Sequence, residues 1–216
     1  MEKESNQSFP EGTASPEEQQ GVGTEEQARA LWYAVLSRLF YAAPDRALLD
    51  GLATSAPPDP EAEPSPFLES WTALQAACRA ADPEALREEF ESLFIGVGKA
   101  PVTPYTSAYA ASHAPDRHLL GLRNTLQAWG LIRAEQVFEA EDHVSALFDS
   151  MRWLIEQRRP LEDQRAFFEA FVDRSVPLFC NAINSSPAAD FYRRAGEFAR
   201  AFVAVEKDAF DMHTAA

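Results

Sequence analysis

Two short stretches hold the residues whose types and spacing could support chemistry. The first is residues 96–99, with the sequence GVGK, and the second is residues 139–143, with the sequence EAEDH. Glycines next to a lysine invite comparison with a loop that binds phosphate through its backbone amides. Carboxylates next to a histidine could bind a metal ion or a cationic partner. Each possibility depends on the elements that position the residues.

The comparison with a phosphate-binding loop fails. A Walker loop has a glycine five residues before its second glycine and Ser or Thr after the lysine, but this chain has Leu93 and Ala100 at those positions. A predicted helix also precedes the stretch, where a Walker loop follows a strand. Gly96 and Gly98 instead predict the end of that helix, because glycine accepts the positive φ of a C-terminal cap. We therefore expect no direct nucleotide binding through this loop.

The segment after the glycines is predicted to be an ordered loop. Pro101 and Pro104 keep the neighbouring residues extended. Pro104, Tyr105 and Tyr109 are large enough to pack against other elements. We therefore expect this loop to cross the body of the domain.

The histidines and carboxylates do not form a complete metal or catalytic set. His113 and His118 could lie near each other, but Asp142 and His143 would point about 100° apart on a helix. Glu139 and His143 could align only if the helix began early, and a third ligand would have to come from elsewhere. No Ser-His-acid set, Cys-His set or G-x-S-x-G sequence is visible. We expect neither a metal site nor an enzyme, and His143 is expected to form a structural hydrogen bond to a neighbouring loop.

Composition predicts one all-α domain, a helical bundle of roughly eight to ten helices. The 216 residues include only nine glycines, and long β-branched runs are absent. A net charge of −15 argues against nucleic acid and anionic membranes as partners. A cationic partner fits this charge, and so does the simpler reading that acidity keeps the protein soluble.

No feature of the sequence indicates a redox pair or export. Cys78 and Cys180 lack C-x-x-C spacing and are expected to be buried thiols. The N-terminus has no basic region before an apolar run, and no segment approaches 18 consecutive apolar residues. We expect a cytoplasmic protein without stable membrane insertion.

The apolar spacing divides the chain into a tail and a helical domain. Residues 1–24 are poor in large apolar side chains and are predicted to be a disordered acidic tail, followed by an all-helical domain over residues 25–212. Thr24 is expected to cap the first helix, and the five prolines within 55–66 predict a surface loop. The first helix is predicted from Thr24 to Pro44, and further helices through 48–52 and over 67–80. Asp82 is expected to cap the helix that runs into the first stretch, with Pro83 in its first turn. Helices are also predicted over 116–129 with Gly130 as C-cap, over 141–157, over 161–182 as one or two helices with a kink before Pro177, and from 191 onward after a turn at 185–187.

Taken together, the two stretches resemble the TorD/DmsD/NarJ family of redox-enzyme maturation chaperones. One matching motif is LFIGVGK at 93–99 followed by PYTSAY at 104–109, and the other is EAEDHV at 139–144 leading to Leu147 and Met151. Their order and separation are similar to the family pattern. The resemblance extends over residues 25 to about 210, since the first and last predicted helices also fit.

The resemblance implies a non-enzymatic, all-helical cytoplasmic chaperone. Family members bind the twin-arginine signal peptide, or a terminal segment, of a molybdenum-cofactor enzyme until the cofactor is inserted. The implied partner is therefore the catalytic subunit of a molybdenum-containing oxidoreductase, with no nucleic acid and with a homodimer left open. No resident cofactor is implied, although transient contact with molybdenum cofactor or guanine nucleotide stays open.

The resemblance also assigns roles to residues of the two motifs. By this resemblance the client peptide would be bound by Glu139, Glu141, Asp142, His143, Tyr105, Ser107 and Tyr109, and the loop would be shaped by Gly96, Gly98, Lys99, Pro101 and Pro104. Acidic side chains suit a peptide with two arginines, and a groove of Phe, Leu and Trp would receive its apolar segment.

Several departures from the family pattern indicate a different client. Val97 and Ala140 stand where relatives often have proline, and Phe171, Val172 and Ser175 lie where many relatives have a His-Leu pair and a Trp. Two alternatives remain. The protein could be a scaffold or cofactor-delivery protein that binds the folded client without reading a leader, or a metal-dependent enzyme that uses His143 with neighbouring carboxylates.

Overall fold

The computed structural model describes residues 16–56, 63–96, 100–110, 115–131 and 140–213, and it confirms the all-α fold class. Within these residues, backbone pairing of the β type is confined to an isolated bridge between Tyr105 and His143. The elements are α1 (Pro16–Tyr41), α2 (Arg46–Thr54), α3 (Pro66–Ala80), α4 (Pro83–Phe90), the π-helix η1 (Glu91–Ile95), α5 (Ser107–Ala110), α6 (Pro115–Ala128), α7 (Val144–Glu156), α8 (Leu161–Phe167), the π-helix η2 (Phe168–Val172), α9 (Val176–Ser185) and α10 (Phe191–Met212).

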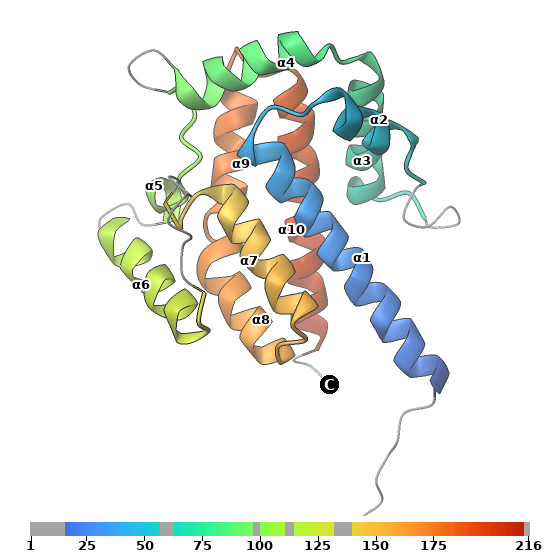
Figure 1. Ribbon diagram of the computed structural model, residues 1–216, viewed down its shortest axis with the longest axis vertical. Coiled ribbons are helices and arrows are strands. Elements are labelled where there is room, and N and C mark those ends of the chain that lie inside the picture. The colour runs from blue at the N-terminus through green and yellow to red at the C-terminus, as the bar shows by residue number, and fades with distance from the viewer. Residues whose placement is uncertain (1–15, 57–62, 97–99, 111–114, 132–139, 214–216) are drawn as a thin grey trace, which may run out of the picture.

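The long helices form the body of the bundle. Helix α1 packs along α7, and α10 packs against α3 and α9. Figure 1 shows α4 across one end of this bundle, the C-terminal end of α10 at the other end, and α6 at its side. Residues 100–106, which lead into α5, therefore run from the α4 end of the bundle toward α6 (Figure 1).

Local capping signals set several helix ends, as predicted for Asp82, Gly96 and Gly130. The Asp45 carboxylate accepts a hydrogen bond from the Leu48 N–H at 2.8 Å, and Asp82 accepts one from the Ala85 N–H at 3.3 Å. Gly96 ends η1 with a φ of 63°, and Gly130 follows α6 with a φ of 76°. Glycine suits both positions because it adopts positive φ without a steric cost from a Cβ.

Other expected boundaries are wrong. Helix α1 begins at Pro16, so Thr24 lies inside the helix and is not its N-cap. Helix α7 begins at Val144, three residues after the expected start at Glu141, and His143 is its N-cap. The prediction that 1–24 is disordered falls mostly on residues 1–15, outside the described residues. It stays a prediction, as does the domain boundary at residue 25.

The expected kink in the segment 161–182 is a change of helix type. Helix α8 continues into η2, where the Asp173 N–H bonds to the Phe168 carbonyl at 2.9 Å, five residues back. Helix α9 then begins at Val176, and Pro177 lies in its first turn, where its missing N–H leaves no bond unmade. The segment is therefore two α-helices separated by a π-helical turn and a short break.

An aromatic cluster lies beneath the loop that follows η1. Phe94 of η1 contacts Tyr192 of α10 with ring centroids 5.0 Å apart, and Phe179 of α9 at 6.0 Å. Phe40 of α1 contacts Phe179 at 5.2 Å. The contacts of Phe94 with Tyr192 and of Phe40 with Phe179 are edge to face, and such contacts add to the free energy of burying the rings. Elements from both halves of the chain therefore fix the position of η1.

The two cysteines are buried and free, as predicted. Cys78 lies in α3, and burial raises the pKa of its thiol to about 11. Cys180 lies in α9, and burial raises its pKa to about 12. Both side chains therefore stay protonated at neutral pH and contribute to packing.

A buried ion pair joins α1 to α10. The guanidinium of Arg29 donates from Nε and Nη2 to the two oxygens of Glu206, each at 2.8 Å. The Tyr33 hydroxyl donates to the same carboxylate at 2.9 Å. These bonds satisfy a glutamate that is only 2% exposed, and they fix α1 against α10.

The N-terminus of α10 is capped from a distant position. The carboxylate of Glu89 accepts hydrogen bonds from the backbone N–H groups of Asp190 at 2.8 Å, Phe191 at 3.2 Å and Tyr192 at 2.9 Å. Asp190 is the N-cap residue, but its own side chain makes no capping bond. A negative group at this place also interacts favourably with the helix dipole. The end of α4, which leads into the first motif, and the last helix are therefore directly connected.

Replacing Glu89 with Gln should destabilise the protein by about 1–2 kcal/mol, because a neutral amide accepts these bonds more weakly than a carboxylate. The free energy of unfolding in urea measures this loss. Glu88 is exposed on the same helix, so Glu88→Gln is a matched control. A loss no larger for Glu89→Gln than for the control would contradict the capping role.

Candidate functional site

The two motifs meet at a backbone junction between the loop before α5 and the turn before α7. The Thr106 N–H donates to the Asp142 carbonyl at 2.8 Å, and the Val144 N–H donates to the Pro104 carbonyl at 2.9 Å. Tyr105 and His143 form the isolated antiparallel bridge between these two bonds. We call residues 104–107 and 141–144 the loop–helix junction. Tyr105 and His143, 38 positions apart in the sequence, are thus held side by side.

Asp142 holds the loop in place through hydrogen bonds. Its side chain is buried, and the residue is 2% exposed. Its Oδ2 accepts a hydrogen bond from the Ser107 N–H at 3.3 Å, and its carbonyl also accepts one from the Thr106 hydroxyl at 2.9 Å. A direct contact between this carboxylate and a client arginine would therefore require the loop to move. The geometry favours a positioning role.

His143 ties the start of α7 to the loop. The residue is 5% exposed, and its Nδ1 lies 2.7 Å from the hydroxyl of Ser145 and accepts from the Ser145 N–H at 3.3 Å. Its ring meets the ring of Tyr105 edge to face, with centroids 5.5 Å apart. His143 therefore acts as a helix cap and packs against the loop at the same time.

The rest of the loop is fixed to the aromatic cluster. The Val102 N–H donates to the Leu93 carbonyl at 3.0 Å, which holds the loop onto η1. The Tyr109 hydroxyl donates to the Thr103 carbonyl at 2.8 Å, and the Tyr109 ring contacts Phe179 with centroids 6.1 Å apart. Burial raises the pKa of Tyr109 to about 12, so its hydroxyl stays a donor. The predicted packing of this loop against the domain is confirmed.

The prolines and glycine of the first motif shape the path of the loop. Gly96 provides the turn after η1, Pro101 is exposed, and Pro104 is buried beneath the junction. The predictions for Gly98, Lys99 and Glu139 fall outside the described residues, as do those for Val97 and His113. These predictions stay untested.

Glu141 is the acidic residue of the junction that lies nearer the surface. The side chain of Glu141 is 19% exposed, and its Oε2 accepts a bond from Nε of Arg123 at 3.0 Å. Arg123 comes from α6 and is 49% exposed. The sequence did not single out Arg123, because the pairing joins two elements and leaves no local pattern.

Helix α6 covers this face of the bundle through His118 and Trp129. The His118 ring contacts Phe171 of η2 at 5.4 Å, and Trp129 contacts Phe167 of α8 at 5.7 Å. Burial lowers the pKa of His118, nearby Asp142 opposes this shift, and Arg174 adds to it. The imidazole is therefore held in its neutral form more strongly than in water, and it packs as an apolar ring.

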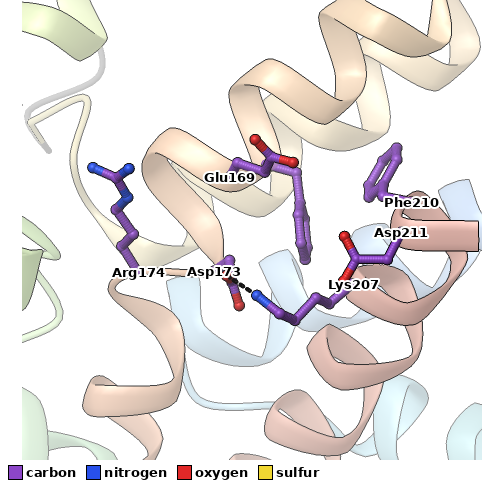
Figure 2. Close-up of a pocket in the computed structure, with 7 residues that line it drawn as sticks. Glu169, Asp173, Arg174, Lys207, Phe210 and Asp211 are labelled. Carbon is purple, nitrogen blue, oxygen red and sulfur yellow. Dashed lines mark hydrogen bonds and ion pairs between the residues drawn. The ribbon is translucent and has the colours of Figure 1, made fainter. Parts of the chain in front are cut away.

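A cavity of about 200 Å³ lies where η2 meets α10. In Figure 2, Lys207 points toward Asp173, while Arg174 points away from it. Lys207 lies 2.5 Å from Asp173, and Arg165 lies 2.6 Å from Glu169, so these charges are compensated within the chain. The lining residues are Phe168, Glu169, Asp173, Arg174, Lys207, Phe210 and Asp211. The cavity contains neither of the motifs, and we take the loop–helix junction as the candidate site.

Two other features, a metal site and a membrane-spanning helix, are absent from the described residues. Within them, no group of three or more His, Cys, Asp or Glu side chains is arranged to hold a metal ion. Among the helices of the described part of the chain, none is both long and apolar enough to cross a membrane.

Comparison with known proteins gives one family match. The family model described as nitrate reductase delta subunit matches residues 61–181, which is more than half of the 216 residues. The matched region begins before α3, ends in α9 and includes both motifs of the junction. No curated protein matches the chain.

Replacing Asp142 with Ala should loosen the loop, because the Ser107 N–H loses its acceptor. We expect faster hydrogen exchange at the amides of Ser107 and Tyr109 and a stability loss of about 1–2 kcal/mol. Asp149→Ala removes an exposed carboxylate from α7 and is the control. Equal exchange at the two loop amides in both variants would show that Asp142 does not hold the loop.

Proposed function

Because this chain belongs to the nitrate reductase delta subunit family, whose members are redox-enzyme maturation chaperones of the NarJ and TorD type, we propose that it binds the twin-arginine leader, or a terminal segment, of its client. The family acts in the maturation of molybdenum-containing oxidoreductases, so the implied partner is the catalytic subunit of such an enzyme. The chaperone holds that client until the cofactor is inserted. This step takes place in the cytoplasm, before the client is exported.

The loop–helix junction is the observation that supports this proposal most. It joins the two motifs of the resemblance through backbone hydrogen bonds, so the two motifs lie side by side. The Glu141 side chain is partly exposed, whereas Asp142 is buried. We therefore assign the direct contact with a client arginine to Glu141, together with Glu139, and the positioning of the loop to Asp142 and His143.

The chemistry of the loop–helix junction fits a basic and partly apolar peptide. A guanidinium binds a carboxylate through charge-assisted hydrogen bonds, and the net charge of −15 favours the approach of a cationic segment. Exposed apolar side chains occur on two elements near the junction. Ile95 lies in η1, which is bonded to the loop through Val102, and Leu120 lies in α6, which reaches the junction through Arg123. Such side chains can pack against the apolar segment that follows the arginines of a leader.

A scaffold that binds the folded client without reading its leader is the second candidate. The family match supports it equally, because a maturation chaperone must contact the catalytic subunit in either case. The two candidates differ in the part of the client that they require. Binding to a client from which the leader has been removed separates them.

The test is a titration of the purified protein with the leader peptide of a molybdoenzyme encoded beside it. We expect binding at micromolar concentrations, and Glu141→Gln should weaken it about tenfold because the guanidinium loses a charged acceptor. Glu162→Gln is the matched control, since Glu162 is exposed at the start of α8, beyond the far end of α7.

Two results would reject this function. The first is no binding of the leader at about tens of micromolar, which corresponds to a binding free energy weaker than about −6 kcal/mol. The second is unchanged affinity after the two client arginines are replaced with lysine or alanine. Full binding of the leaderless client would support the scaffold candidate instead.

A further inference from the structure

We propose that Arg123 of α6 occupies the guanidinium-binding position on Glu141, so that an arginine of the client must displace it. This inference rests on the proposed function and adds an intramolecular competitor to its site. The observation behind it is the ion pair between Arg123 Nε and Glu141 Oε2 at 3.0 Å. The carboxylate that we assign to the client is thus already paired with the chemical group that the client would present.

This ion pair differs from most others formed by arginines of the chain. Arg87, Arg152 and Arg194 pair with carboxylates three or four residues away on their own helices. Arg123 instead reaches from α6 to the turn before α7, a separation of 18 residues. The pair therefore joins α6 to the loop–helix junction. Breaking it leaves the hydrogen bonds within α6 and within α7 intact.

Helix α6 has other attachments to the bundle. Leu122 and Leu126 are buried, at 0% and 8% exposure. The rings of His118 and Trp129 contact η2 and α8. These apolar contacts hold α6 without Arg123, whose side chain is 49% exposed. Loss of the ion pair should therefore leave the fold intact while it exposes Glu141 to a ligand.

The guanidinium of a client arginine can replace that of Arg123 on the Glu141 carboxylate. A client arginine can form the same charge-assisted hydrogen bond that Arg123 forms, and its planar fork can engage both oxygens. A lysine offers a single ammonium and replaces Arg123 less well. Competition by an exposed ion pair should weaken the apparent affinity by about two- to fivefold.

Removal of Arg123 tests the competition directly. In a titration with the fluorescently labelled twin-arginine leader, Arg123→Ala should bind about two- to fivefold more tightly than the wild type. Arg117→Ala is the matched control, because Arg117 is exposed on α6 and its loss changes the net charge equally. Thermal unfolding of both variants checks that α6 stays folded.

A double-mutant cycle identifies the residue through which Arg123 acts. In a Glu141→Gln background, Arg123→Ala should no longer tighten binding, since the contested carboxylate is gone. Equal affinities of the Arg123→Ala and Arg117→Ala variants, or weaker binding by Arg123→Ala, would overturn the competition and leave the proposed function intact. Failure of the wild type and of both arginine variants to bind the leader would instead overturn the proposed function, and this inference with it.

Discussion

The candidate site depends on backbone hydrogen bonds between two segments that the sequence separates. The amide of Thr106 bonds to the carbonyl of Asp142, and the amide of Val144 bonds to the carbonyl of Pro104. Because these bonds use main-chain atoms, they do not require a particular side chain at the surface positions. The junction can therefore stay in place while residues such as Val97 and Ala140 differ from the family pattern. Differences of this kind can change the client and leave the arrangement of the loop unchanged.

Long-range contacts hold the two sides of the junction in place. The loop follows η1, whose Phe94 is packed between rings of α9 and α10, and Glu89 just before η1 caps α10. On the other side, α7 packs along α1, which the Arg29–Glu206 pair fixes to α10. Both sides of the junction are thus attached to α10. The burial of Asp142 and His143 follows from this rigid placement and leaves Glu141 at the surface.

Much of the fold could be predicted from local sequence signals, and the junction only in part. Asp82, Gly96 and Gly130 act within a few residues of themselves, so their capping roles were predicted correctly. The start of α7 was placed too early, because acidic residues suit a helix N-terminus while the bridge to Tyr105 holds residue 143 extended. The capping by Glu89 and the pair of Arg123 with Glu141 join residues distant in sequence, so no local pattern predicts them.

We propose that the client arginines bind at the loop–helix junction. The most direct measurement places a photoreactive benzoylphenylalanine beside the arginine pair of the leader, irradiates the complex and maps the cross-linked residues by mass spectrometry. The account predicts cross-links within residues 103–109 and 140–145 and on the part of α6 around Arg123. Cross-links confined to α2 and α3, with none at these segments, would contradict it.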